Sequence, residues 1–181
     1  MTATYRPTPQ VPALDGMTPL GIAPQKTLEG SRAYLYQMEK DLEERVLEWT
    51  EQLCESLAEN YKQYHLRSMK RMNADSGSEY SRKEIEATEN GTANLMKFRI
   101  QKGRKYYKII QQDFDTFQDR NEYRDGGVHA FVDKKTGQIY KPASWASPAK
   151  YVRYDMRIIK EREYVLNPNN CGWAGGYLYL R

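Results

Sequence analysis

The hydrophobic positions between residues 31 and 73 recur with the period of an α-helix. Steps of three and four residues separate them, which is the spacing of one helix face. Ser31 is suited to the N-cap, and acidic residues cluster early and basic residues late, as the helix dipole favours. We therefore predict one long amphipathic helix over residues 31–73, with an apolar stripe of Leu35, Met38, Leu42, Val46, Trp49, Leu53, Leu57, Tyr61 and Tyr64.

A helix of about 40 residues forms a rod roughly 60 Å long. Such a rod is longer than a small β domain, so part of its apolar stripe needs a further explanation. The stripe either packs along the edge of the domain or pairs with another subunit, which would make residues 31–73 the contact of a homo-oligomer. The sequence leaves both alternatives open.

After Ala93 the hydrophobic period changes from 3.6 to 2, and we place a domain boundary there. The preceding residues form a polar connector in which Ser81 and Glu84 have the spacing of a capping box for one short helix. The N-terminal segment holds five of the eight prolines and no periodicity, which favours an extended arm. The predicted organisation is an arm (1–30), the helix (31–73), the connector (74–93) and a β domain (94–181).

Residues 96–109 alternate between apolar and polar side chains on both sides of a Lys102-Gly103 pair, which predicts a β-hairpin with a two-residue turn. That turn sets the register and places Lys97 opposite Lys108. Directly opposed lysines are destabilising, and an anionic partner would relieve their repulsion. The candidate binding residues of this face are Lys97, Arg99, Arg104, Tyr106 and Lys108.

Single-stranded nucleic acid suits such a face, because cations bind phosphates and an aromatic ring stacks on a base. Two alternatives stay open: an acidic protein partner, or a solvated face that nearby acids neutralise. For the second, the candidates are Asp113, Asp115 and Asp119. A second basic block, residues 127–181, again interleaves bases with aromatic residues, and Lys141, Lys150 and Arg153 would extend the row of cations.

The remaining pattern completes a small antiparallel domain. Residues 128–132 predict a strand, and 133–137 a turn closed by a left-handed glycine, followed by a return strand. Trp145 lies in the next loop and is better suited to cover the sheet edge than to stack on a base. The terminal WAGGYLYLR predicts a last short strand. The fold class is therefore α+β, with a Pro-rich arm, one long amphipathic helix and a small antiparallel domain of about five strands.

Composition and charge add to this picture. The 181 residues are 39% hydrophobic and 12% aromatic, which is too aromatic for a disordered chain. The net charge of +4 hides a block, residues 94–112, with six basic and no acidic residues. Cys54 and Cys171 match no metal spacing and are expected as reduced thiols, although a disulfide is also allowed. No apolar run could span a bilayer and the N-terminus lacks signal-peptide features, so we expect no membrane partner.

The sequence shows no pattern of catalysis or metal binding. His65 and His129 have no Cys, Asp or Glu at metal-ligand spacing and are expected as solvated or packed side chains. The acid-rich residues 113–125 lack the features of an EF-hand, and a solvated loop explains them better than a Mg²⁺ site for nuclease chemistry. Motifs for phosphate or dinucleotide binding are missing. We therefore expect a protein that is not an enzyme, without catalytic residues, metal or cofactor.

Three stretches of the sequence carry a resemblance. These are VHAFVDKKTGQIYKPASWASPAK, the upstream KYYKII and the terminal WAGGYLY. Together they resemble a set of small proteins encoded by tailed bacteriophages, over roughly residues 104–181; the long helix and the Pro-rich arm go beyond it. The resemblance implies a phage origin and an accessory or structural part rather than a metabolic enzyme. It also implies a location in the cytoplasm of the infected host cell or in the virion.

These expectations combine into two functional hypotheses. The leading one is a non-enzymatic bacteriophage accessory protein that binds nucleic acid through the basic, Tyr-bearing face of its sheet. The alternative is a structural component of the virion whose arm and helix contact neighbouring subunits, so that its partners are other phage proteins. A steep loss of affinity with salt favours the first hypothesis, and detection of the chain in purified particles favours the second.

Overall fold

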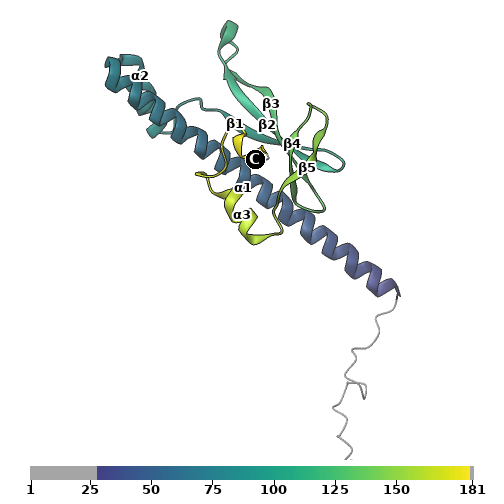
Figure 1. Ribbon diagram of the computed structural model, residues 1–181. Helices are drawn as coiled ribbons and strands as arrows, with labels where there is room; N and C mark the ends of the chain where they lie inside the picture. The colour runs from purple at the N-terminus through teal and green to yellow at the C-terminus, as the bar shows by residue number, and fades with distance from the viewer. Residues whose placement is uncertain (1–27, 180–181) are drawn as a thin grey trace, which may run out of the picture. The chain divides into compact units, whose positions relative to one another are not determined.

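The computed structural model describes residues 28–179, and their fold is α+β, as the sequence predicts. Figure 1 shows a long helix, a shorter helix that follows it, and an antiparallel sheet. Residues 1–27 of the predicted arm lie outside the described residues, while Leu28 already begins the first helix. The elements are α1 (Leu28–Ser76), α2 (Glu79–Glu89), β1 (Lys97–Lys102), β2 (Tyr106–Asp115), the 3₁₀ turn η1 (Phe117–Asp119), β3 (Glu122–Asp133), β4 (Gln138–Pro142), β5 (Pro148–Asp155), α3 (Ile159–Leu166) and the 3₁₀ turn η2 (Gly176–Leu178).

Within residues 28–179, five strands form one sheet in the order β1-β2-β3-β4-β5, and every neighbouring pair is antiparallel. Each strand pairs with the strand before it along the chain, as short connections favour. The predicted antiparallel domain of about five strands is confirmed.

The core lies between α1 and one face of the sheet. Val46, Leu53 and Leu57 of α1 have no exposed surface and belong to one cluster with Ile109 and Val132 of the sheet. Fully burying a leucine contributes about 1.5–3 kcal/mol. The middle of the predicted apolar stripe therefore packs along the domain. Further toward the ends of the stripe, the exposed fractions are 60% for Leu35, 51% for Met38 and 48% for Tyr64.

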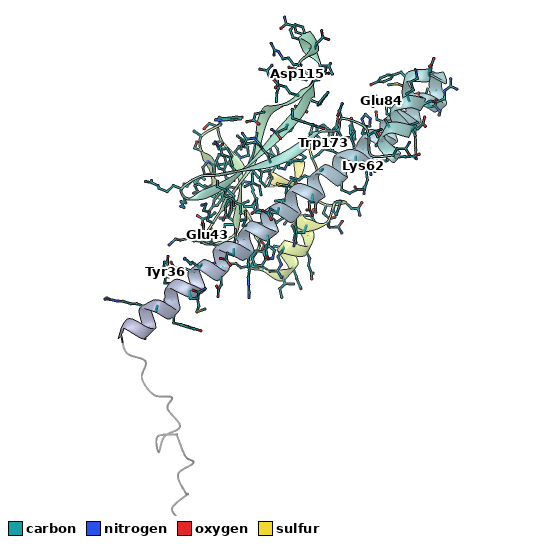
Figure 2. The ribbon with its side chains drawn as sticks, turned by 180° about the vertical axis from the view of Figure 1, so that it is seen from behind. Tyr36, Glu43, Lys62, Glu84, Asp115 and Trp173 are labelled. Carbon is teal, nitrogen blue, oxygen red and sulfur yellow. The ribbon has the colours of Figure 1, made fainter. Side chains whose placement is uncertain are left out.

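The segment after β5 folds back onto α1. Ser56 Oγ donates a hydrogen bond to the Leu166 carbonyl at 2.6 Å, and the backbone N–H of Trp173 donates to Asn60 Oδ1 at 3.0 Å. Figure 2 shows Trp173 beside α1. The prediction of a last strand here is wrong. Gly175 adopts the left-handed conformation, with φ of 78°, and the chain enters η2. The backbone N–H groups make local turn bonds instead of pairing with a neighbouring strand.

The β1–β2 hairpin forms, but its predicted register is wrong. Residues 103–105 connect the strands in place of a two-residue turn, and Lys97 lies opposite Gln112 instead of Lys108. The observed register removes the predicted opposition of two lysines, which would have been destabilising. Because the partner changes by an even number of residues, the strand residues keep their predicted faces.

The acid-rich segment extends the β2–β3 hairpin and is not the predicted solvated loop. Pairing continues to Asp115 and Glu122, and the rings of Phe114 and Tyr123 pack across the strands with centroids 5.1 Å apart. Aromatic cross-strand pairs stabilise antiparallel sheets, which explains why the strands continue through a polar stretch. At the tip, Phe117 is 65% exposed.

The predicted capping box of the short helix is also wrong. α2 has Ser78 as its N-cap residue, and Ser81 lies inside the helix. Ser81 is buried, and its hydroxyl donates to the Ser78 carbonyl at 2.8 Å instead of accepting a hydrogen bond from a free N–H group at the helix start. Within the α1–α2 connection, Gly77 takes a positive φ of 62°, which moves the helix start upstream of the predicted cap.

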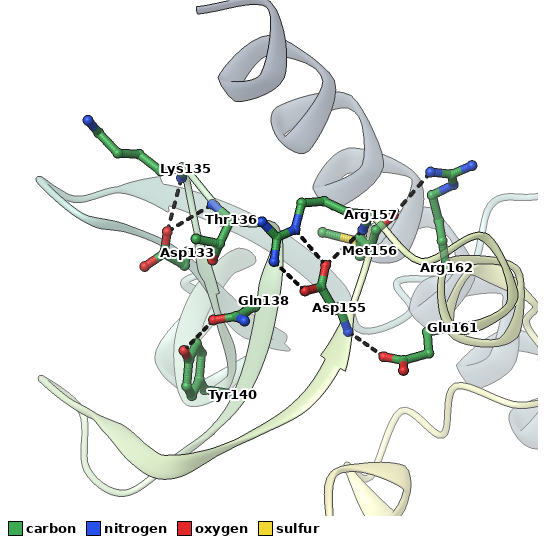
Figure 3. Close-up of polar contacts among 10 residues, drawn as sticks. All are labelled: Asp133, Lys135, Thr136, Gln138, Tyr140, Asp155, Met156, Arg157, Glu161 and Arg162. Carbon is green, nitrogen blue, oxygen red and sulfur yellow. Dashed lines mark hydrogen bonds and ion pairs between the residues drawn. The ribbon is translucent and has the colours of Figure 1, made fainter. Parts of the chain in front are cut away.

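The predicted turn after β3 is confirmed. Gly137 is left-handed, with φ of 65°. Asp133 Oδ1 accepts the backbone N–H groups of Lys135 and Thr136 at 3.0 and 3.1 Å, as Figure 3 shows. A Cβ atom at Gly137 would lie 3.3 Å from Val46 Cγ2, so glycine also permits the close approach of α1.

Cys54 and Cys171 are free and buried, in agreement with the predicted thiols. Burial raises the pKa of Cys54 to about 12 and that of Cys171 to about 11. Both groups are therefore protonated at neutral pH and are poor nucleophiles. The helices of residues 28–179 include none that is sufficiently long and apolar to cross a membrane.

Candidate nucleic-acid interface

The sheet face turned away from α1, here called the outer face, combines cations with aromatic rings. Phe98 and Ile100 pack against the core, so their neighbours along β1 point outward. The same alternation holds along the next three strands, where Tyr107, Ala130 and Ile139 belong to the core. The outer face consists of Lys97, Arg99, Gln101, Tyr106, Lys108, Phe131 and Tyr140.

Arg99 is neutralised within the sheet. Its Nε donates to Asp125 Oδ1 of β3 at 2.8 Å, and a second contact joins its Nη2 to the other carboxylate oxygen. The hydrogen bond from Arg99 is the main cause that lowers the pKa of Asp125 to about 2. The alternative of a face neutralised by nearby acids therefore holds at this position, through an acid that the sequence did not single out.

Arg104 lies in the β1–β2 connection instead of on a strand. The connection and the adjoining strand ends enclose a cavity of about 250 Å³, here called the basic hollow. Its wall contains no carboxylate among the described side chains. Four cations and two rings line it: Lys102, Arg104, Lys105, Lys108, Tyr106 and Phe131.

One of these four cations has a carboxylate nearby. Lys105 Nζ lies 3.6 Å from Asp133 Oδ2, just outside the wall of the basic hollow. The Tyr106 hydroxyl, followed by Asp133, raises the pKa of Lys105, so this side chain stays charged. Among the described side chains, no acid pairs with the other three cations, Lys102, Arg104 and Lys108.

Tyr106 forms part of an aromatic wall and is only partly exposed. Its ring meets Phe131 edge to face at 5.9 Å and Tyr140 at 6.0 Å. Such pairs hold rings in fixed positions. Tyr106 is therefore better placed as a wall of the basic hollow than as the stacking surface predicted from the sequence.

Trp145 supplies a more accessible ring. It is 49% exposed, and Lys108 Nζ lies 5.3 Å from its ring centroid. The loop that carries it is closed by a hydrogen bond of 3.0 Å from the Ala143 N–H to the Ser147 carbonyl. About half of the Trp145 surface remains accessible, so its ring is open to a ligand.

Lys141 and Arg153 lie away from the outer face. Lys141 Nζ is 3.5 Å from the ring centroid of Tyr179, and Arg153 Nε donates to the Leu178 carbonyl at 2.6 Å. Leu178 belongs to the core cluster with α1, so both cations contact the C-terminal segment on the covered side of the sheet. They do not extend the row of outer-face cations.

Two further predicted cations are exposed and lie outside the basic hollow. Lys97 Nζ lies 4.0 Å from the ring centroid of Tyr123, near the base of the hairpin extension. Lys150 Nζ lies 5.4 Å from the ring of its neighbour Tyr151 on β5. The structure therefore brings together Arg104, Tyr106 and Lys108, and separates the other predicted residues from them.

Sequence reasoning missed Lys102, Lys105, Phe131 and Trp145 as parts of this site. The run KGRK at 102–105 was a usable signal, but the two-residue turn placed Lys102 at its apex and Lys105 on the apolar face. Phe131 could be placed on the outer face from the alternation of its strand. The position of Trp145 next to Lys108 depends on how two distant segments meet, and no local pattern encodes it.

Both histidines contact neighbouring polar side chains. His129 is buried, with Nε2 3.1 Å from the Tyr177 hydroxyl, and burial lowers its pKa to about 4. His65 Nε2 lies 3.4 Å from Glu84 Oε2 of α2. Among residues 28–179, no group of three His, Cys, Asp or Glu side chains is arranged to hold a metal ion.

Comparison with known proteins places the chain in one family. A family model described as "Family of unknown function (DUF7717)" matches residues 32–180, which is most of the chain. No curated protein and no solved structure matches. The family description names no activity, partner or source, so the phage association stays a prediction. The match covers the long helix, the sheet and the C-terminal segment alike, and the chain belongs to the DUF7717 family of unknown function.

Proposed function

We propose that this protein binds single-stranded nucleic acid at the basic hollow, as a non-enzymatic accessory protein of a bacteriophage. One observation carries the proposal: four cations and two aromatic rings line a cavity without a carboxylate in its wall. The resemblance of residues 104–181 to small phage proteins supports the assignment to a phage.

The electrostatic part of the argument rests on which cations have partners. Lys134 and Lys135, which follow β3, lie 3.3 and 3.4 Å from Glu43 and Glu39 of α1. Carboxylates thus compensate the charges of Lys134 and Lys135, as Asp125 compensates that of Arg99, so these three cations attract an anionic ligand only weakly. The three unpaired cations of the basic hollow retain theirs, and phosphate groups are the anions that repeat along a nucleic acid.

The aromatic part favours a single strand. Stacking on a side chain requires an unpaired base with an open face, which a duplex does not offer. Trp145 is half exposed beside Lys108, so a phosphate held by Lys108 brings its base within reach of the indole. Base–aromatic stacking contributes about 1–3 kcal/mol per base.

The test is the salt dependence of oligonucleotide binding, followed by fluorescence anisotropy. Binding through phosphates predicts that log K falls linearly with log [salt], with a slope of about −0.7 for each phosphate neutralised on a single strand. A duplex of the same sequence should bind more weakly because it cannot stack on Trp145. Absence of binding at low salt would contradict the proposal.

A second candidate function, a structural component of the virion, draws on the exposed part of the apolar stripe. Leu35 and Met38 are 60% and 51% exposed, and exposed apolar side chains in a row often mark protein contacts. In this case α1 would contact a neighbouring subunit. Light scattering of the wild type and of the double variant Leu35→Glu, Met38→Glu tests self-association. Mass spectrometry of purified particles that never detects the chain would contradict a place in the virion.

A further inference from the structure

The unpaired cations that line the basic hollow lie at one end of the sheet. Lys102, Arg104 and Lys108 line one cavity, at the end of β1 and the start of β2. The next cation along β1 is Arg99, which Asp125 neutralises. Lys97 lies five residues from Lys102, about 16 Å away along an extended strand. The positive charge is therefore concentrated at one point and is not spread as a continuous track.

The shape of the site agrees with this concentration. A backbone track is an open groove, whereas these cations line a hollow of about 250 Å³ that Tyr106 and Phe131 close on one side. Phe131 is 2% exposed and Tyr106 is held edge-on against it, so the aromatic wall does not open readily. These two rings limit the hollow on their side, which suits a group at which the bound chain ends. The geometry favours the end of a strand over its middle.

We propose that the basic hollow binds a terminal phosphate of a nucleic-acid strand. This inference rests on the proposed function and names the part of the ligand that is bound. A terminal phosphate monoester carries a charge of about −1.5 to −2 at neutral pH and three acceptor oxygens, more than a diester within the chain. Arg104 presents a planar fork of donors for two of these oxygens, and Lys102 and Lys108 add point charges.

Trp145 completes the recognition of an end. Its ring centroid is 5.3 Å from Lys108 Nζ, the cation that lines the hollow on the side of the 143–147 loop. The first base next to the bound phosphate can therefore stack on the exposed half of the indole. End recognition uses one phosphate and one base, which are the two features that the site offers.

The experiment compares three oligonucleotides of one sequence with an internal fluorophore: one with a 5′-phosphate, one with a 3′-phosphate and one with hydroxyl groups at both ends. The full chain should bind one of the phosphorylated strands about tenfold more tightly than the hydroxyl strand, the factor that one extra charge-assisted contact supplies. Inorganic phosphate at millimolar concentration should reduce this preference.

Two variants assign the preference to the site. Arg104→Gln should abolish the preference for the phosphorylated strand. Lys97→Gln changes another exposed cation, one outside the hollow, and should weaken the binding of all three strands by the same factor. Both positions are exposed, and circular dichroism checks that the variants fold.

Each outcome has a distinct meaning. Equal binding of all three strands overturns end recognition and leaves the proposed function standing. A preference that persists in Arg104→Gln overturns the assignment to the basic hollow. Failure of every strand to bind overturns both proposals together.

Discussion

The two ends of the β2–β3 hairpin arrange their charges in opposite ways. At the tip, Arg120 and Arg124 lie 3.5 and 3.1 Å from the same carboxylate, Asp115, which Figure 2 labels on the hairpin. At the other end, Lys102, Arg104 and Lys108 have no acid among the described side chains as a partner, and only Lys105 has one, Asp133 at 3.6 Å. One pair of strands thus has an end at which the cations are paired with a carboxylate and an end at which most cations have no carboxylate partner.

This difference shows that partner geometry, more than charge count, marks a binding surface. Arg120 and Arg124 at the tip are exposed, as Lys102 and Arg104 of the basic hollow are, yet Asp115 compensates the charge of both arginines. A polyanion gains little from cations that already have carboxylate partners. The basic hollow is the end at which the phosphate that we propose as its ligand would meet uncompensated charge.

The largest expected effect is the removal of the unpaired cations. The triple variant Lys102→Gln, Arg104→Gln, Lys108→Gln should reduce affinity for a single-stranded oligonucleotide by about 100- to 1,000-fold, because three charge-assisted contacts are lost. Fluorescence anisotropy at low salt measures it. The control is the double variant Arg120→Gln, Arg124→Gln at the tip, which should bind nearly as the wild type does. Comparable losses in both variants would show that the two ends do not differ.

The next effect concerns the aromatic rings. Trp145→Ala should cost about 1–3 kcal/mol of binding free energy, because a stacked base loses its platform. Phe117→Ala is the matched control, since Phe117 is 65% exposed at the tip but lies among compensated charges. Titration with the same oligonucleotide compares them. An unchanged affinity for the Trp145 variant would remove stacking from the proposal.

A smaller effect follows from releasing Arg99. Asp125→Asn removes the carboxylate that neutralises this cation, so affinity for single strands should rise severalfold. Asp119→Asn makes the same change in net charge at an acid that has no cation partner among the described side chains, and should have less effect. Anisotropy titrations test it, and equal gains in both variants would point to net charge alone.

The same pair predicts a pH dependence of stability. The pKa of Asp125 falls from an ordinary 3.8 to about 2 in the folded chain, chiefly through Arg99. The ionised group therefore stabilises the fold fully at pH values above 4, and this contribution is lost as the pH falls toward 2. Urea unfolding between pH 5 and pH 2 should show a steeper loss of stability in the wild type than in Asp125→Asn. Parallel curves would exclude a stabilising role for the pair.

Much of the fold could be predicted from local pattern. The central stripe of the helix, Val46, Leu53 and Leu57, is buried as expected, and the left-handed Gly137 closes its turn. The errors fall where a long-range contact outweighs a local signal. The predicted last strand does not form, because Leu178 enters the core through a turn. The acid-rich segment, predicted as a loop, continues two strands because Phe114 packs on Tyr123.

Less of the candidate site was predictable. The outward positions of Arg99 and Lys108 followed from alternation along each strand. Alternation could not predict that Arg99 is ion-paired while Lys108 is not, because the partner of Arg99 is 26 residues away in the chain. Lys141 and Arg153 lie in basic, aromatic stretches like those of the site, but the C-terminal segment engages them on the other side of the sheet.

The sequence by itself determined the long helix, the β1–β2 hairpin and the face that each residue of this hairpin takes, because the periods of 3.6 and 2 are properties of neighbouring positions. Only the tertiary structure decided which cations keep their charge for a ligand. Ion pairing depends on distances between segments far apart in the chain, and these distances are set when α1, the sheet and the C-terminal segment close around a common core.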